Sequence, residues 1–326
     1  MTRAVALISG GLDSILAAML IKNQGIDVIG LCFKSAFFGD EDAQRMAKQA
    51  GIPLAVIDFT DEHIEMTKNP KHGYGKNMNP CIDCHALMIK RAGKFMEKVG
   101  ADFLITGEVL NQRPMSQNLQ SLGIESKESG YEEKILRPLS ALNLPPTEME
   151  VSGLVDRKRL MGVKGRSRKS QMELAEKLNV HDYPTPAGGC KLTEPGFSRR
   201  LKDLYTYKKD FTIDDISLLK IGRHFRLTPD VKVISTRDEK ELEMIKPLIE
   251  DSDIVFDTVD FSGSTIIVKG NPAQPEIYLA ASITARYSKG NSFDSVKVRY
   301  GMKREKEYTI IEVKPISETD ILKYML

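Results

Sequence analysis

A short glycine-containing loop near the N-terminus has residue types that could bind a phosphate chain. Two adjacent glycines let the backbone turn tightly and approach a ligand. A helix beginning at such a loop presents free N–H groups to an anion. The Asp13 carboxylate would repel a bare phosphate, so its presence indicates Mg²⁺ at the same place. We therefore predict a pyrophosphate cradle, without the Gly-Lys-Ser/Thr ending of the Walker loop, formed by Ser9, Gly10, Gly11, Leu12, Asp13 and Ser14.

Three of the four cysteines have the spacing of metal ligands. Cys81 and Cys84 stand three residues apart at the start of an expected helix, so both sulfurs can face one metal or cluster. Cys190 comes much later, beside two glycines that permit close backbone approach. A closed zinc site with His85 as fourth ligand, a metal-free dithiol relay, and a three-cysteine [4Fe–4S] cluster are all compatible with this pattern. The fourth, Cys32, is expected to be a small buried apolar residue.

The elements that position these residues alternate between apolar runs and amphipathic runs. This alternation predicts βαβ units and an α/β fold with a doubly wound, mostly parallel sheet. Because loops follow the carboxyl ends of the strands, Glu108 and Gln112 are expected near a bound nucleotide or target base. The polar segment 109–134 is expected to be a mobile loop. Strands are predicted at 4–9, 26–33, 54–59 and 101–108, and helices at 12–24, 40–51 and 85–99.

A change in composition near residues 200–212 divides the 326-residue chain into two expected domains. Residues 1–205 form the nucleotide-binding and catalytic domain, and they include a basic segment at 157–169. Residues 211–326 read as a separate α+β domain of ordinary size, which ends in two strands. No apolar stretch reaches the roughly 18 residues of a membrane span. The N-terminus reads as mature structure without a signal cleavage site, so a cytoplasmic protein without membrane attachment is expected.

The loop sequence SGGLDS, directly after an N-terminal strand, resembles the PP-loop ATP pyrophosphatase superfamily. The segments PCIDC, PAGGC, TGEVLNQRPMSQ and ILRPLSAL resemble those of tRNA thiolases, in particular the catalytic domain of 4-thiouridine synthetases. This resemblance covers about residues 1–200. It implies that ATP is cleaved to AMP and pyrophosphate while an oxygen of a tRNA uridine is adenylated. It also implies that Cys81, Cys84 and Cys190 hold a [4Fe–4S] cluster.

The same resemblance assigns roles to individual residues. The nucleotide-binding set is the glycine loop together with Gly107 and Glu108, and the catalytic set is Asp13, Cys81 and Cys190. Asp83 and His85 are candidates for acid–base work because they flank the cysteines, and Asp83 is added to the catalytic set. The resemblance implies ATP-dependent uridine thiolation, with 4-thiouridine favoured. Two alternatives stay open, namely persulfide-based 2-thiouridine synthesis through Cys81 or Cys190, and another adenylating PP-loop enzyme with structural zinc.

The chain departs from 4-thiouridine synthetases because it shows neither their N-terminal RNA-binding region nor a rhodanese-type domain. Sulfur is therefore expected to arrive as sulfide or from a donor protein. A homodimer is left open, as a way for the RNA-binding domain of one subunit to serve the active site of another. A catalytically inactive RNA-binding module is a further alternative, against which the intact glycine loop argues.

Two groups of basic residues are candidates for holding tRNA. Net charge is only +2, so any basic surface must be local. Residues 211–326 resemble the RNA-binding domain of the NFACT family through IGRHFRL, KVISTRDEKE, AASITARYSKGNS and VKVRYG. The alternative is that these charges are ordinary solvated surface. The phosphate contacts expected are Arg157, Lys158, Arg159, Lys164, Arg166, Arg168 and Lys169 in the basic segment, and Arg223, His224, Arg237, Lys289 and Arg299 in the C-terminal domain.

Overall fold

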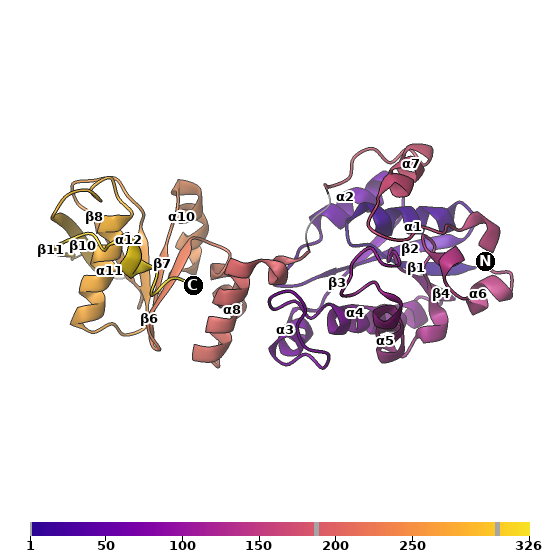
Figure 1. Cartoon of the computed structure of the whole chain (residues 1–326), viewed down its shortest axis with the longest axis horizontal. Helices are drawn as coiled ribbons and strands as arrows, with labels where there is room; N and C mark the ends of the chain where they lie inside the picture. Colours follow the sequence, from indigo (N-terminus) through magenta and orange to yellow (C-terminus); the bar gives the residue numbers. More distant parts are fainter. Residues whose placement is uncertain (1, 186–188, 304–306) are drawn as a thin grey trace. The chain divides into compact units, whose positions relative to one another are not determined.

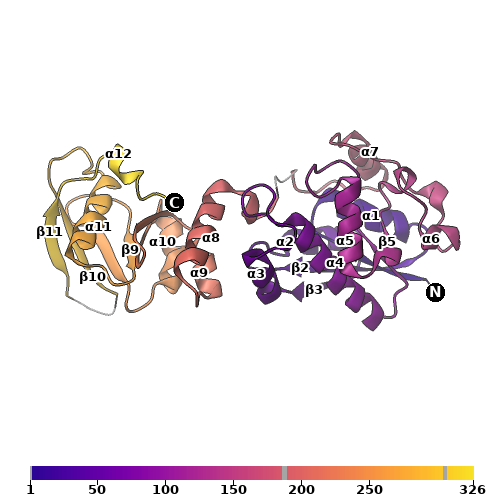
Figure 2. The ribbon, with the colours of Figure 1, turned by 60° about the horizontal axis from the view of Figure 1, so that its bottom comes forward.

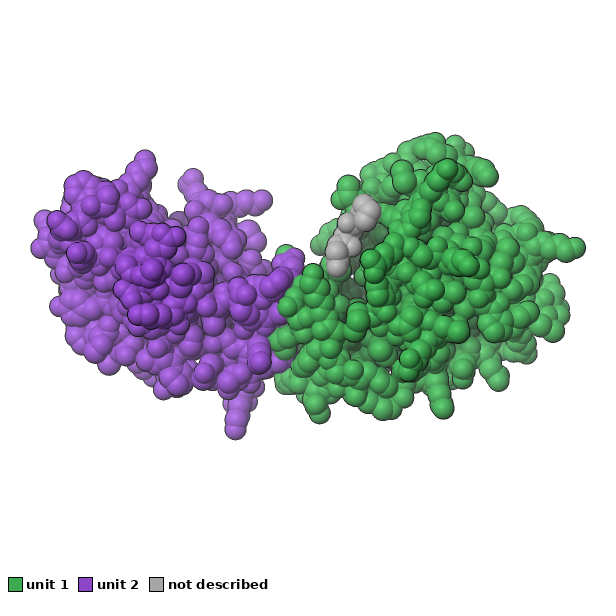
Figure 3. All heavy atoms as spheres, viewed as in Figure 1, with its two compact units in different colours: residues 1–193 green, residues 194–326 purple. Residues whose placement is uncertain are grey.

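The computed structural model describes residues 2–185, 189–303 and 307–326 (Figure 1). The chain forms two compact units, Met1–Thr193 and Glu194–Leu326 (Figure 3). The division falls earlier in the chain than the change in composition suggested, because helix α8 (Pro195–Tyr207) is part of the second unit. No helix among the described residues is long and apolar enough to cross a bilayer.

The first unit is built on a five-stranded sheet in the order β3-β2-β1-β4-β5. All its strand pairs are parallel, and in the centre Val5 pairs with Ile29 on one side and Leu104 on the other. The order reverses between β1 and β4, which is where open parallel sheets bind ligands. The strands are β1 (Arg3–Leu7), β2 (Asp27–Lys34), β3 (Leu54–Asp58), β4 (Phe103–Ile105) and β5 (Ile135–Leu136).

Helices cover both faces of this sheet because side chains of the buried strands alternate between two cores. Ala4 and Ala6 of β1 lie in the core with α1, α2 and α7, whereas Val5 lies in the core with α4. Helix α5 packs against α4 (Figures 1 and 2). The α/β, doubly wound expectation is confirmed. The helices are α1 (Leu12–Lys22), α2 (Glu41–Gln49), α3 (Thr60–Lys68), α4 (Cys81–Lys98), α5 (Leu119–Ser129), α6 (Glu148–Val151) and α7 (Lys169–Lys177), with 3₁₀ turns at Glu132–Lys134, Ala141–Asn143, Arg157–Arg159 and Lys191–Thr193.

Two expectations for this unit were wrong. The segment 109–134 is not wholly a mobile loop, because α5 occupies its second half and ends at Gly130 in the left-handed conformation. The expected bound of residue 85 for helix α4 was also wrong, because the helix begins at Cys81, although the cysteine pair does lie at a helix start as expected. Helix α3, which carries the buried His63, was not anticipated.

The second unit is an α+β fold around a six-stranded antiparallel sheet in the order β11-β10-β8-β9-β7-β6. Ala280, Ala281 and Ala285 let α11 pack closely on one face. Ile245 of α10 packs with Ile234 and Ile267 in a separate core. The elements are α9 (Ile213–Leu218), β6 (Arg223–Thr228), β7 (Val231–Ser235), α10 (Glu239–Ile245), the 3₁₀ turn Lys246–Leu248, β8 (Ile254–Thr258), β9 (Ile266–Lys269), α11 (Gln274–Arg286), β10 (Val296–Met302), β11 (Thr309–Val313) and α12 (Glu318–Ile321).

Candidate functional site

The glycine loop closes the gap between β1 and α1 at the sheet's switch point. Gly10 has φ +83°, and a β-carbon there would lie 2.6 Å from Cβ of Asp42, so only glycine fits. The Ser14 hydroxyl donates to the Gly11 carbonyl at 2.8 Å and accepts from the Ser9 N–H at 3.3 Å. No side chain caps the N-terminus of α1. Its first N–H groups are therefore available to an anion, as the sequence predicted.

Asp13 is held at one oxygen and unsatisfied at the other. Gln112 donates to Oδ2 of Asp13 at 2.6 Å, and Gln171 donates to Oε1 of Gln112 at 3.0 Å. The second oxygen, Oδ1, is buried and has no hydrogen-bond partner. A buried acceptor without a donor is costly, and a divalent cation would satisfy it. Asp13 therefore fits the expected Mg²⁺. Gln112 was expected near the nucleotide, whereas nothing in the sequence pointed to Gln171.

The turn after β4 reaches the same loop through Gly107. This glycine lies against the backbone of Asp13 and Ser14. The carboxylate of Glu108, by contrast, accepts hydrogen bonds from Arg137 at 2.9 Å and from Thr106 at 2.9 Å. The residue of this turn that contacts the nucleotide loop is thus Gly107, through its backbone, and the Glu108 side chain serves a different group of residues.

The three cysteines of the expected cluster site come together in the first unit. Burial, and then the charges of Cys190 and Cys81, raise the pKa of the Cys84 thiol well above its ordinary value. Burial, and then the charge of Cys81, likewise raises the pKa of Cys190. These mutual effects require the thiols to be neighbours, although Cys190 is far from the other two in sequence. Cys32 is buried apart from them, with a pKa raised to about 12 chiefly by burial.

Cys84 is the most enclosed of these thiols and contacts a neutral histidine. Its Sγ lies 3.4 Å from Nε2 of His63, whose Nδ1 lies 3.0 Å from the Ser35 hydroxyl. The His63 ring stacks on Phe59 with centroids 4.7 Å apart. Burial lowers the pKa of His63 to about 4. Without a cationic partner, a thiolate at Cys84 is unfavourable, so this residue is better suited to ligate a metal centre than to act as a free nucleophile.

The cysteine group does not have the spacing of a closed zinc site. With Zn–S bonds of about 2.3 Å, tetrahedral sulfurs stand about 3.8 Å apart. Over residues 2–185, 189–303 and 307–326, the ligand-type side chains with atoms all within 4.8 Å of one another are His85, Glu108 and Glu125, not the cysteines. His85, the candidate fourth zinc ligand, directs its Nδ1 to those carboxylates. His85 therefore belongs to the carboxylate cluster rather than to a zinc site with the cysteines.

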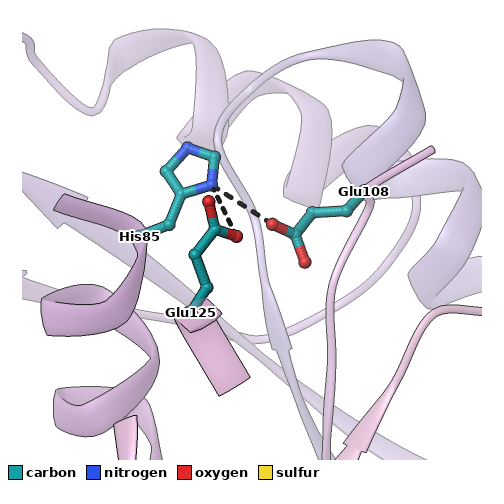
Figure 4. A group of neighbouring side chains, drawn as sticks. All are labelled: His85, Glu108 and Glu125. Carbon is teal, nitrogen blue, oxygen red and sulfur yellow. Dashed lines mark hydrogen bonds and ion pairs between the residues drawn. The ribbon is translucent and has the colours of Figure 1, made fainter. Parts of the chain in front are cut away.

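His85, Glu108 and Glu125 form a buried cluster beside the cysteine pair (Figure 4). Nδ1 of His85 lies 3.2 Å from Oε1 of Glu108 and 3.5 Å from Oε2 of Glu125. Burial, reinforced by the charge of Glu108, raises the pKa of Glu125 to about 8. Burial also acts to raise the pKa of Glu108, but the charge of Arg137 and the His85 contact bring it below its usual range. Glu125 and Arg137 were missed, since Glu125 lies on the unexpected helix α5.

Asp83 has a defined partner in the structure. Its Oδ2 accepts a hydrogen bond from the backbone N–H of His72 at 2.9 Å. This contact fixes the chain segment that precedes the cysteine pair. Asp83 therefore has a structural role in holding this segment, and the acid–base role expected for it remains a prediction.

The basic segment contains both engaged and exposed side chains. Arg157 donates to the carbonyls of Ala141 at 2.9 Å and Leu144 at 3.0 Å, and it pairs with the buried Glu150. Arg159 donates to the carbonyl of Asn23 at 2.7 Å. These two arginines join parts of the first unit to each other. Arg168 is half-buried, and the exposed side chains of the segment are Lys158, Lys164, Arg166 and Lys169.

In the second unit, too, some of the expected phosphate contacts are engaged with other residues and some are exposed. The guanidinium of Arg223 lies over the Tyr287 ring at 4.7 Å, and Lys289 is exposed three residues beyond the end of α11. Arg299 lies over the Tyr308 ring at 5.3 Å. His224 was expected to contact phosphate, but it is fully buried and its Nε2 lies 2.7 Å from the Ile221 carbonyl. That expectation is wrong, because a phosphate group in solvent cannot contact the fully buried His224 ring.

Comparisons with known proteins match the two units separately. Residues 1–144 match the family described as thiamine biosynthesis protein (ThiI), and residues 222–325 match the NFACT protein RNA binding domain. The resemblances expected from the sequence, to PP-loop tRNA thiolases and to an NFACT-type domain, are thereby confirmed. The chain thus contains one region similar to the ThiI family and one similar to the NFACT RNA-binding domain.

Individual relatives are similar over part of the chain. The tRNA-specific 2-thiouridylase MnmA of Clostridium acetobutylicum is 37% identical over 128 residues, which is 32% of this chain and 35% of that protein. MnmA 1 of Fusobacterium nucleatum subsp. nucleatum is 28% identical over 181 residues, 53% of this chain and 49% of that protein. This chain thus spans only about a third to a half of the length of these relatives.

Among solved structures, a 4-thiouridine synthetase–RNA complex with bound ATP is 20% identical and has a TM-score of 0.36. The match covers 55% of this chain and 52% of that one. A TM-score this low does not establish a shared fold, so the assignment of the fold depends on the strand order of each sheet.

Proposed function

We propose that this protein is an ATP-dependent tRNA sulfurtransferase that adenylates a uridine oxygen and replaces it with sulfur. One observation carries the proposal. A continuous series of contacts runs from the nucleotide loop to the cysteines, because Gly107 lies on Asp13 and Ser14, while the next residue, Glu108, contacts His85. His85 directly follows Cys84 on α4. An activating site and a sulfur-handling site side by side are what this reaction requires.

The residues of the loop would carry the activation step. The uridine oxygen attacks the α-phosphorus of ATP, a new P–O bond forms, and the bond to pyrophosphate breaks. The free N–H groups at the start of α1 would stabilise the charge that develops on the phosphates. Asp13, fixed by Gln112, would hold Mg²⁺ on the departing pyrophosphate through its unsatisfied oxygen.

The cysteines would serve the second step. Cys81, Cys84 and Cys190 would hold a [4Fe–4S] cluster, which supplies an iron without a protein ligand that can bind sulfide. Sulfur attacks the activated ring carbon, a C–S bond forms, and the C–O bond to AMP breaks. His63 and the apolar surroundings of Cys84 would keep water away from this position. Sulfur would come as sulfide or from a donor protein.

The second unit would bind the tRNA. Its match to an RNA-binding domain covers 222–325, and it places a half-buried Arg223 and an exposed Arg299 over aromatic rings. Arginine and lysine contacts to phosphates provide sequence-independent affinity. The exposed part of the basic segment, including Lys164 and Arg166, would contribute from the first unit. Because tRNA is its substrate, the enzyme would act in the cytoplasm.

Nucleoside mass spectrometry tests the proposal. Unmodified tRNA is incubated anaerobically with the iron-reconstituted protein, ATP, Mg²⁺ and sulfide, and then digested. We expect a thiouridine that is missing without ATP and missing with Cys190→Ala, while Cys32→Ala still forms it. If pyrophosphate is released and the cluster is bound but the tRNA gains no sulfur, the thiolase assignment is wrong and another PP-loop substrate must be sought.

The same measurement decides between two thiouridines. The chain's ThiI-type region and its TGEVLNQRPMSQ segment favour 4-thiouridine. The names of the curated relatives favour 2-thiouridine, which makes it the second candidate. Chromatographic retention separates the two isomers. For the persulfide route, a donor that already carries sulfane sulfur, such as a persulfide-loaded cysteine desulfurase, replaces sulfide. A product formed at full rate from this donor by iron-free protein that needs only Cys81 and Cys190 would favour that route.

A further inference from the structure

We propose that His85, Glu108 and Glu125 bind a divalent transition-metal ion, at a site separate from the three cysteines and from the Mg²⁺ expected at Asp13. The three residues come from α4, from the turn after β4 and from α5 (Figure 4). One ligand atom from each lies within 4.8 Å of the other two. The inference goes beyond thiolation, since it concerns metal binding alone.

The distances between the ligand atoms suit a shared ion. Nδ1 of His85 is 3.2 Å from Oε1 of Glu108 and 3.5 Å from Oε2 of Glu125. An ion with bonds of about 2.0–2.2 Å to nitrogen and oxygen places neighbouring ligand atoms about 3.0–3.5 Å apart. The two observed separations fall in that interval.

Glu125 provides an independent reason to expect a cation. Its side chain is fully buried, and neither carboxylate oxygen has a hydrogen-bond partner. Figure 4 shows this carboxylate directed at the His85 ring, where Glu108 also points. The His85 ring faces this carboxylate at 3.5 Å, an ion-pair contact that lacks hydrogen-bond geometry. A divalent cation bound by the three ligand atoms would give the buried Glu125 oxygens the short polar contact that the histidine does not provide.

The surroundings of Glu108 resemble the outer support of a metal ligand. Arg137 and Thr106 both donate to Oε2 at 2.9 Å, which leaves Oε1 for the side facing His85. Arg137 is itself held by the Ser126 hydroxyl at 3.1 Å. Partners of this kind orient a ligating carboxylate and are typical of built metal sites.

The donor set selects the class of ion. One imidazole and two carboxylates suit Mn²⁺, Fe²⁺ or Zn²⁺, whereas Mg²⁺ and Ca²⁺ prefer oxygen ligands throughout. Such an ion would tie the turn bearing Gly107 to the first turns of α4 and to α5. It would thereby fix the nucleotide loop relative to the cysteines without touching either.

Manganese binding to the full-length protein, followed by electron paramagnetic resonance without nucleotide or tRNA, tests the site. Mn²⁺ is the probe because it binds thiolates weakly. To exclude the site proposed at Asp13, every protein compared carries Asp13→Asn, and this background stands as the wild type below. We expect one bound ion in it and an affinity more than about tenfold lower when Glu125→Gln is added. Glu128→Gln changes an exposed glutamate on the same helix and should bind Mn²⁺ as the wild type does. Cys81→Ser should do so as well.

Thermal unfolding guards against loss of folding. Glutamine has the shape of a protonated glutamate, so Glu125→Gln should keep the wild-type Tm in the absence of metal. Mn²⁺ should raise the Tm of the wild type but not of Glu125→Gln. No bound Mn²⁺ in the Asp13→Asn background, equal binding after Glu125→Gln is added, or loss of binding in Cys81→Ser instead would each overturn the proposal. None of these outcomes depends on sulfur transfer.

Discussion

Gly107 and Ser14 are in direct backbone contact, although almost a hundred residues separate them in the chain. A β-carbon on Gly107 would lie 2.4 Å from Cα of Ser14 and 2.5 Å from its nitrogen. The turn after β4 therefore packs on the first turn of the helix that begins at the nucleotide loop. This contact joins the two strands between which the sheet order reverses.

Gly107→Ala should disturb the nucleotide loop, because the new methyl group would clash with the backbone atoms of Asp13 and Ser14, which cannot move aside as a side chain can. We expect a loss of about 1–3 kcal/mol in the free energy of unfolding and weaker ATP binding by calorimetry. Gly123→Ala is the matched control, since it lies in α5 with nothing within 4 Å of a β-carbon. It should stabilise by about 0.5–1 kcal/mol. Wild-type ATP affinity in Gly107→Ala would contradict this reading of the contact.

Serine substitutions at Cys81, Cys84 and Cys190 should each abolish or strongly reduce iron binding after anaerobic reconstitution. The reason is that all three thiols belong to one neighbourhood in the structure. Iron and sulfide analysis, together with the visible absorbance of the reconstituted protein, measures how much cluster each variant binds. Cys32→Ser, which alters a cysteine outside the group, should retain wild-type iron. Full iron content in any one of the three variants would remove that residue from the ligand set.

Arg137→Met should be strongly destabilising, because it leaves the buried Glu108 carboxylate without its cation. Removing one partner of a buried ion pair costs about 3–5 kcal/mol, measured here by chemical denaturation. The double variant Arg137→Met with Glu108→Gln should recover much of that loss, since no unpaired charge remains. Equal instability of the single and double variants would show that Arg137 acts through packing rather than charge.

Lys232 should make the stability of the second unit depend on alkaline pH. Burial lowers its pKa to about 8, although Asp203 lies 3.4 Å away. Between about pH 8 and 10.5 the folded chain has lost this proton while the unfolded chain still binds it, so stability rises with pH across that window. The rise is at most about 3 kcal/mol. This rise in the free energy of unfolding should be absent in Lys232→Met. Calorimetry of both proteins at pH 7.5 and pH 10 measures it. The same change with pH in both proteins would refute the prediction.

Lys289→Ala should weaken tRNA binding and lower the slope of log affinity against log salt by about 1. Lys289 is exposed near the end of α11 and is among the expected phosphate contacts. Lys323→Ala provides the control, because Lys323 is exposed but pairs with Asp320 at 2.6 Å. Filter binding at several salt concentrations measures both. An unchanged slope in Lys289→Ala, or an equal change in Lys323→Ala, would remove Lys289 from the RNA surface.

The sequence predicted well where local chemistry determines structure. Gly10 needs a positive φ and a close neighbour, and this requirement is visible in the residue type itself. The parallel sheet followed from continuous apolar runs such as that around Val5, which is fully buried. The separate α+β domain followed from a change in composition and a second set of alternating patterns.

Helix α5 could not be predicted because its buried face is polar. Ser121, Glu125, Ser126 and Ser129 are all buried, so the apolar periodicity that reveals most helices is missing. The serine hydroxyls bond locally, as Ser126 does to the Leu122 carbonyl, whereas Glu125 meets His85 from another helix. The carboxylate cluster was hidden for the same reason, whereas the cysteine group was recognisable from residue type and spacing.

Cys84 and His85 are consecutive residues on the single rigid helix α4, and each serves a different group of ligand-type side chains. An axial shift or rotation of this helix must move both by the same amount. If both groups bind ions as proposed, occupancy of the cysteine group and occupancy of the carboxylate cluster would be linked equilibria. If both favour one position of the helix, filling either one raises affinity at the other by the same factor, so the protein would take up its inorganic components cooperatively.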